Sequence, residues 1–119
     1  MTEDKNLLKR GEIWLANLNP TKGSEQSGIR PVIIFQNEIV SRFSTTVITI
    51  PLTTNQNRVS LPICLKIEKG DGGLAEDSVA LCYQMRVLDK TRLIRLLGQL
   101  EWDTVKQLED IVLLTLGYI

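Results

Sequence analysis

Arg30 is the residue whose place in the sequence says most about chemistry. It follows a polar loop, residues 19–28, that contains Pro20, two glycines and two serines, and it directly precedes Pro31. Because a following proline disfavours the α region, we expect Arg30 to be extended where the loop meets an apolar strand. A guanidinium held in this way can donate two hydrogen bonds to one phosphate group. An arginine that only binds loop carbonyls would suit the same position, so both roles stay open.

Two further groups of polar side chains lie next to apolar runs. Thr53 and Thr54 follow such a run and precede two asparagines and a glutamine, so their hydroxyls and amides can donate to phosphate oxygens or base edges. Gln84 and Arg86 are two residues apart in an expected strand, which places them on one face of it. The same patterns are also typical of a turn that caps its own backbone and of the solvated face of a strand.

Charge is balanced overall but unevenly spread. The 119 residues carry 14 basic and 14 acidic side chains, so the protein is no bulk polycation and any nucleic-acid contact must use a local patch. The best candidates for phosphate contacts are cations that few carboxylates oppose: Arg30 and Lys22 beside the loop, and Arg86, Lys90, Arg92 and Arg95 further along. Only six residues are aromatic, and we expect Trp14 and Trp102 to lie in a core or interface.

Several classes of site are excluded by composition. The chain has no histidine, which removes His-based acid–base pairs, catalytic triads and most zinc sites. Cys64 and Cys82 stand inside apolar runs, so we expect two small core residues. Neither a metal nor another cofactor is expected.

No run is long and apolar enough for a membrane span, and the first residues lack the hydrophobic stretch of a signal peptide, so we expect no membrane partner and a cytoplasmic location.

The elements that must position these side chains are mostly strands. Runs of β-branched or alternating apolar residues predict strands over 11–17, 31–35, 46–50, 61–67, 78–82, 84–88 and 94–100. A polar loop is expected over 51–57 and a turn over 70–73, whereas three- and four-residue spacing predicts a helix over 105–116 that ends at Gly117. We expect a flexible tail over 1–9 and one domain over 10–119. The fold class is mainly β: a strongly bent antiparallel sheet or small barrel capped by the C-terminal helix.

Three segments in order resemble the motifs of one family. Residues 10–34, with Gly11-Glu12-Ile13-Trp14 and Gly23-Ser24-Glu25-Gln26-Ser27-Gly28-Ile29-Arg30-Pro31, resemble the N-terminal signature of the MazF/PemK toxins of bacterial toxin–antitoxin pairs. Pro51-Leu52-Thr53 resembles the second motif of this family, and residues 77–93 resemble the third. The resemblance runs from about Arg10 to the C-terminus, and three motifs in family order are more specific than any single loop.

This resemblance implies a fold and an activity. The implied fold is an SH3-like small barrel of the PemK/CcdB type, and the implied assembly is a homodimer. The implied activity is metal-independent cleavage of single-stranded RNA, usually mRNA, by attack of its own 2′-hydroxyl. Arg30 and Thr53 would be the catalytic pair, and an antitoxin with an extended acidic segment would block the groove. The residues lining that groove would be Ser24, Gln26, Thr54, Gln84 and Arg86.

Two alternatives belong to other functional classes. Toxins of the CcdB type share this fold but bind DNA gyrase, partly through their C-terminal residues, and this chain ends in the only loosely similar Leu116-Gly117-Tyr118-Ile119. A relative without catalytic activity would keep the groove for RNA or antitoxin. The Arg30 and Thr53 motifs favour the nuclease, although no general acid or base can be assigned, because the pKa values of arginine and threonine lie far from neutrality.

Overall fold

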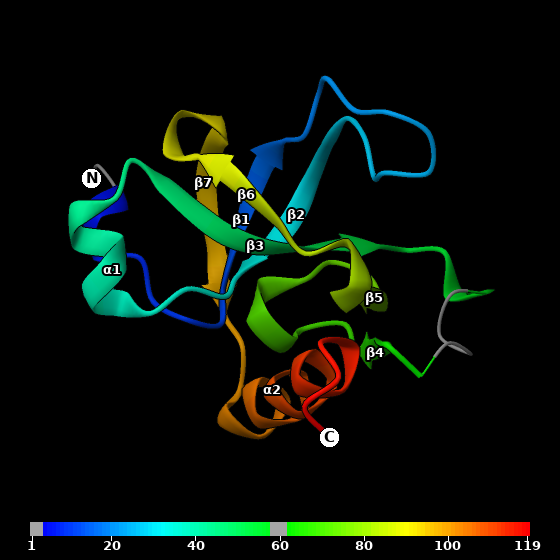
Figure 1. The fold of residues 1–119 in the computed structure, drawn as a ribbon. Coiled ribbons are helices and arrows are strands. Elements are labelled where there is room, and N and C mark those ends of the chain that lie inside the picture. The colour runs from blue at the N-terminus through cyan, green and yellow to red at the C-terminus, as the bar shows by residue number, and fades with distance from the viewer. Residues whose placement is uncertain (1–3, 58–61) are drawn as a thin grey trace.

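The computed structural model describes residues 4–57 and 62–119, which form a bent antiparallel sheet with one long helix packed against it (Figure 1). The strands are β1 (Glu12–Asn17), β2 (Ile29–Ile34), β3 (Thr46–Thr53), β4 (Cys64–Ile67), β5 (Ser78–Leu81), β6 (Arg86–Asp89) and β7 (Leu93–Gln99). The helices are α1 (Glu38–Phe43), α2 (Trp102–Thr115) and the short 3-10 helices η1 (Lys5–Leu7), η3 (Asp71–Gly73), η4 (Cys82–Gln84) and η5 (Lys90–Arg92).

Strand β3 joins the two halves of the sheet. One of its edges pairs with β2, while its other edge pairs first with β6, over residues 46–49, and then with β5, over residues 52–53. The strand order is β4-β5-β3-β2-β1-β7, with β6 beside β3 off this path. Within the described residues β4 and β7 each pair with one strand only, so the sheet is bent but does not close into a barrel. The expected fold, mainly β with a C-terminal helix, is confirmed.

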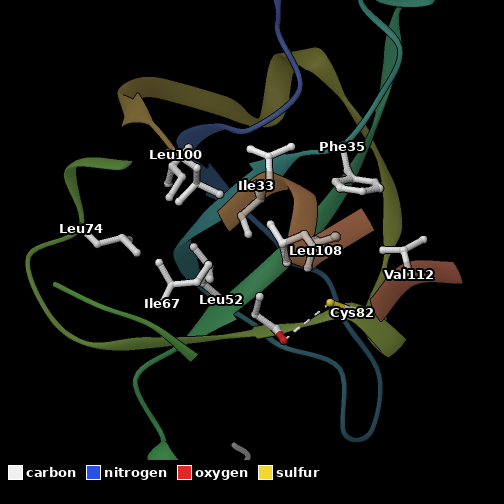
Figure 2. Close-up of a cluster of buried hydrophobic side chains, with 13 residues drawn as sticks. Ile33, Phe35, Leu52, Ile67, Leu74, Cys82, Leu100, Leu108 and Val112 are labelled. Atoms are coloured by element: carbon white, nitrogen blue, oxygen red, sulfur yellow. Dashed lines mark hydrogen bonds between the residues drawn. The ribbon is translucent and has the colours of Figure 1, made fainter. Parts of the chain in front are cut away.

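Alternation along β2 and β3 directs side chains into two separate cores. Ile33, Ile50 and Leu52 point to one face of the sheet, where Leu108 of α2 completes a cluster (Figure 2). Val32 and Ile34 point to the opposite face. The buried cluster on that face consists of Leu8, Trp14, Ala16, Leu18, Val32, Ile34, Val47, Leu88 and Leu93. Each strand residue is therefore committed to one face by its register.

Helix α2 is amphipathic and is capped by another element. Val105, Leu108 and Val112 are buried, at the three- and four-residue spacing predicted from the sequence. Asp71 of η3 accepts hydrogen bonds from the Glu101 backbone N–H (2.9 Å) and the Thr104 hydroxyl (2.6 Å), which satisfies donors at the start of the helix. Gly117, with φ of +85°, ends it in the left-handed conformation, as predicted. No helix in the described ranges has the length and apolar character to cross a membrane.

Among the strand boundaries that differ from the prediction are those of β2, β3 and β4. Strand β3 continues through Pro51 to Thr53, where a polar loop was predicted, because Pro51 pairs with Val32 and the next two residues pair with β5. Pro31 is the third residue of β2 and not the first; the β2–β3 ladder begins only at Val32, so one edge of the strand is free beside this proline. Strand β4 begins at Cys64, and Leu61, the first residue of the predicted strand, lies outside the described residues.

Helix α1 was not predicted, and its apolar residues explain the omission. Asn37 caps it by accepting a hydrogen bond from the Ile39 N–H (2.8 Å). Ile39, Val40 and Phe43 are exposed, so the segment has no buried apolar stripe of helical period.

Three single residues also differ from expectation. The predicted strand 84–88 begins only at Arg86, and Gln84 lies in η4 instead. Leu8, within the predicted tail, is buried in the second core, so this part of residues 1–9 packs on the sheet. Trp14 is buried as expected, but Trp102 is 71% exposed and is not a core residue.

Cys82 gives the fold a dependence on alkaline pH. Burial raises the pKa of its thiol to about 12, whereas a cysteine in an unfolded chain has a pKa near 8.5. The unfolded state therefore loses this proton first, and the contribution to stability is full below about pH 8.5 and is lost as the pH rises toward 12. We predict that the free energy of unfolding, from urea titrations at pH 8 and 10.5, falls more in the wild type than in Cys82→Ala. Equal falls would contradict this role.

Candidate nucleic-acid interface

One face of the sheet carries three of the predicted site residues. The β2–β3 register pairs Val32 with Pro51, and Arg30 and Thr53 lie two residues beyond this pair on their own strands, where the ladder has ended. The β3–β6 register pairs Thr49 with Arg86, and Thr49 is an even number of residues from Thr53. Because side chains alternate with period two, Arg30, Thr53 and Arg86 belong to the face that also holds the second core.

Arg30 binds the loop and keeps donors free. Its Nε donates a hydrogen bond to the Ser27 carbonyl (2.7 Å), which is the loop-binding role left open by the sequence. Within the described residues, no carboxylate pairs with this guanidinium, and its two terminal nitrogens have no hydrogen-bond partner. The side chain therefore has a fixed inner nitrogen and a fork of donors available to an anion.

Thr53 likewise combines a local role with a free donor. Its side chain is largely buried, and its Oγ1 accepts a hydrogen bond from the Asn55 N–H (3.2 Å), the capping turn considered from the sequence. An oxygen that accepts in this way keeps its own O–H for a further acceptor. Thr54, the next residue, is exposed.

Gln84 ties the loop to the body of the protein. Its Oε1 accepts a hydrogen bond from the Gln26 N–H (3.0 Å), and its Nε2 donates to the Ser24 carbonyl (3.2 Å) and to the Tyr83 hydroxyl (3.3 Å). Gln84 was predicted to share a strand face with Arg86, and this prediction is wrong, because Gln84 lies in η4. Through η4 it nevertheless reaches the loop residues Ser24 and Gln26, which the sequence analysis had grouped with it.

A cavity of about 230 Å³ lies where these residues meet. Gln26 lines it from the loop, Gln84 and Arg86 from the η4–β6 segment, and Pro51 from β3. The other lining residues are Glu25, Tyr83 and Met85, which sequence reasoning did not select. The only indication in the sequence for these three residues was that each lies next to a predicted site residue. Ser24, Arg30, Thr53 and Thr54 do not line the cavity.

Two of the expected phosphate contacts have other partners. Lys90 is 7% exposed, and its ammonium donates to the Ser41 carbonyl near the end of α1, so the prediction of a surface contact is wrong. Arg92 donates through one terminal nitrogen to the carbonyls of Asn17 and Asn19. Lys22 and Arg95 are exposed, as a phosphate contact requires. No cluster of three or more metal-ligating side chains occurs in the parts of the chain that the structure describes.

The loop contacts of Gln84 lead to a prediction about stability. Gln84→Ala removes hydrogen bonds to both Ser24 and Gln26, and we expect it to lower the free energy of unfolding by about 1–2 kcal/mol. The matched variant Gln84→Glu keeps an acceptor for the Gln26 N–H but cannot donate to the Ser24 carbonyl. Hydrogen exchange at the Gln26 amide should therefore accelerate strongly in Gln84→Ala and less in Gln84→Glu. Unchanged exchange in both variants would contradict the contact.

Comparison with known proteins places this geometry in a family context. An "Endoribonuclease MazF" from Staphylococcus saprophyticus is 40% identical to this chain over 111 residues, which are 93% of this chain and 92% of that protein. A crystal structure of MazF from Deinococcus radiodurans has a TM-score of 0.78 at 21% identity and covers 93% of this chain and 97% of its own. An endoribonuclease solved in complex with its cognate antitoxin, from a mycobacterial species, has a TM-score of 0.77 at 21% identity and covers 92% of this chain and 95% of its own.

The two structures show that the chain has the same fold, and at 21% identity they show nothing about its function. The family is shown by the sequence itself, since the model of the PemK-like, MazF-like toxins of type II toxin–antitoxin systems matches residues 9–116. The match to this family model covers all three motifs and the residues that line the cavity. The chain belongs to the PemK-like, MazF-like toxin family.

Proposed function

We propose that this protein is the endoribonuclease toxin of a toxin–antitoxin pair and cleaves single-stranded RNA. The observation that carries the proposal is that Arg30 and Thr53 extend from neighbouring strands on one face of the sheet, just beyond the last β2–β3 pair, each with hydrogen-bond donors left free. The 40% identical relative is named as an endoribonuclease, and this supports the same activity for a chain that carries these residues.

The proposed reaction needs no protein nucleophile. The RNA 2′-oxygen forms a bond to phosphorus and the bond from phosphorus to the 5′-oxygen breaks, while the proton of the 2′-hydroxyl leaves and the 5′-oxygen gains a proton. The products are a 2′,3′-cyclic phosphate and a 5′-hydroxyl end. Arg30 would donate to the two non-bridging oxygens as negative charge develops, and Thr53 would add a third donor from a fixed position. Catalysis would then come from positioning and charge stabilisation.

Substrate binding is proposed for the cavity and its surroundings. Gln26, Gln84 and Arg86 line the cavity, Ser24 precedes the lining residue Glu25 in the loop, and Thr54 is exposed directly after β3. Single-stranded RNA suits such a surface, because an unpaired backbone can rotate into line for attack and present its bases. Residues 10–119 contain all of these groups, and we propose them as the toxin domain, acting in the cytoplasm where mRNA is found.

The proposed protein partner is a cognate antitoxin. Structures of an antitoxin-bound mycobacterial endoribonuclease and of MazE–MazF from Deinococcus radiodurans share the fold of this chain and support a partner of that kind. An extended acidic segment would pair with Arg86 and with the free donors of Arg30, and it would exclude RNA from the same face.

Catalysis by Arg30 and Thr53 can be tested with purified, antitoxin-free protein and a long single-stranded RNA in EDTA. We expect sequence-biased cleavage with 5′-hydroxyl ends. Arg30→Ala and Thr53→Val should each lower kcat by about 100-fold or more, because each removes a donor to the developing charge. Arg30→Lys and Thr53→Ser should lose less.

The control for this experiment is Arg42→Ala, which removes an exposed arginine of α1 outside the site. Circular dichroism should show that every variant is folded. Intact RNA with folded wild-type protein, or full activity of Arg30→Ala, would contradict the proposal.

We also propose that the protein is a homodimer, on the basis of its uncovered apolar surface. Ile39 and Phe43 of α1 are 67% and 85% exposed, and Tyr118 and Ile119 at the C-terminus are 76% and 70% exposed. A chain of this size buries more apolar area by pairing with a second copy. We predict a species of twice 13.4 kDa by sedimentation velocity at micromolar concentration.

Single variants can identify the dimer surface. Phe43→Glu tests the α1 group and Tyr118→Glu tests the C-terminal group, and the variant at the interface should sediment as a monomer. A wild-type species of 13.4 kDa at micromolar concentration would contradict the homodimer.

A further inference from the structure

The loop between β1 and β2 has little regular structure of its own, yet it brings Ser24 and Gln26 to the site. It projects from the sheet at the end of the molecule opposite α2 (Figure 1). Its far limb is held by Gln84 and Arg30, as described above. Its near limb, residues 17–19, is held by a different side chain, Arg92, which comes from η5 between β6 and β7.

Arg92 contacts the near limb on both sides of a buried residue. One terminal nitrogen of Arg92 donates to the Asn17 carbonyl (3.2 Å) and also to the Asn19 carbonyl. Leu18, between these two residues, is fully buried in the second core. Arg86 adds a longer hydrogen bond to the Leu18 carbonyl (3.4 Å). Three successive carbonyls of the near limb are therefore bound by two arginines.

The near limb in turn holds the far limb. The Leu18 N–H donates to the Gly28 carbonyl (2.9 Å), and the Gly28 N–H donates to the Asn19 side-chain oxygen (3.0 Å). Ser27, the neighbour of Gly28, accepts the hydrogen bond from Arg30 Nε (2.7 Å). A continuous series of contacts therefore runs from Arg92 through both limbs to the guanidinium of Arg30.

We propose that Arg92 is a positioning residue: it sets the conformation of the loop that orients Arg30, and it does not itself bind the RNA phosphates. The proposal rests on the proposed function, since it concerns the same reaction. Both acceptors of Arg92 are backbone carbonyls of the near limb, so its hydrogen bonds are made to the loop.

The turn that carries Arg92 is itself firmly attached. Asp89 caps η5 by accepting hydrogen bonds from the Thr91 N–H (2.9 Å) and hydroxyl (2.7 Å), and these bonds lower the pKa of its carboxyl group. Lys90 is buried, with its backbone N–H donating to the Thr45 carbonyl (3.0 Å) and its ammonium to the Ser41 carbonyl. Arg92 therefore extends from a turn anchored to α1 and β3, and the loop is positioned from a rigid part of the fold.

Arg95 provides a matched control for the charge of Arg92. It lies three residues further on, in β7. Its side chain is exposed and has no hydrogen bond or ion pair within the described residues. Arg92→Ala and Arg95→Ala thus remove the same charge from nearby positions, but only the first removes a contact with the loop. Arg92→Lys keeps the charge but lacks the planar, fixed donors of the guanidinium group.

The experiment combines three measurements on the full chain. Steady-state kinetics on RNA give kcat and KM. Binding of a 2′-deoxy-substituted oligonucleotide over a range of salt concentrations gives the number of phosphate contacts without cleavage. Amide hydrogen exchange at Leu18, Gln26 and Gly28 reports the loop directly, with Leu108 in α2 as the internal reference. The third measurement does not depend on activity.

We expect Arg92→Ala to lower kcat by about 10- to 100-fold with little change in KM, because a small displacement of a positioned group is costly. Exchange at the three loop amides should accelerate while that at Leu108 is unchanged, and Arg92→Lys should be intermediate in both respects. The salt dependence should stay at the wild-type slope, and Arg95→Ala should leave exchange at the three loop amides unchanged.

Other results would overturn the proposal. A salt slope reduced by about 0.7 with unchanged loop exchange would make Arg92 a phosphate contact. An equal acceleration of loop exchange in Arg95→Ala would show that charge alone matters. If the wild type does not cleave RNA, the proposed function fails, but the exchange measurement still decides whether Arg92 holds the loop.

Discussion

The structure depends on the alternation of side chains along the neighbouring strands β2 and β3, which pack against two separate cores. Strands β2 and β3 each direct every second residue into the core beneath α2 and the others into a second core on the opposite face. Where that second core ends, the same alternation continues into Arg30 and Thr53. A shift of register by one residue would bury these polar groups and expose Val32 and Ile34, at a cost of several buried side chains. The stability of the cores therefore fixes the face on which the site is built.

The remaining parts of the site are held by hydrogen bonds to backbone carbonyls and amides, and less by ion pairs. Arg30, Arg86 and Arg92 all donate to loop carbonyls, and Gln84 binds both an amide and a carbonyl of the loop. Such contacts hold a long polar loop in one conformation without a core of its own. They also leave donors free at Arg30 and Thr53, so the groups that maintain the structure are the ones available for a phosphate.

The motifs allowed the family to be predicted, and runs of β-branched or alternating apolar residues allowed the strands to be predicted, whereas the roles of the site residues stay predictions. Arg30, Thr53 and Arg86 do share one face, and Gln26 and Gln84 do meet at one cavity with Arg86. The predicted route to this arrangement was partly wrong, because Gln84 lies in a 3-10 turn and Thr53 in a strand. Helix α1 was missed because its six residues are too few to show a helical period, and its apolar residues do not face a core.

The sequence by itself determined local preferences and chemical types: an extended arginine before a proline, a turn-forming threonine, an amphipathic C-terminal helix and the absence of histidine. These follow from the chemistry of each residue and its immediate neighbours. Only the tertiary structure decided which cations are free. In the sequence, Lys90, Arg92 and Arg95 are alike: each is a cation that few carboxylates oppose. In the structure, Lys90 and Arg92 bind carbonyls at distant positions, 49 and 73 to 75 residues away. Such partners are set by strand register and turn geometry, which join segments that no local pattern connects.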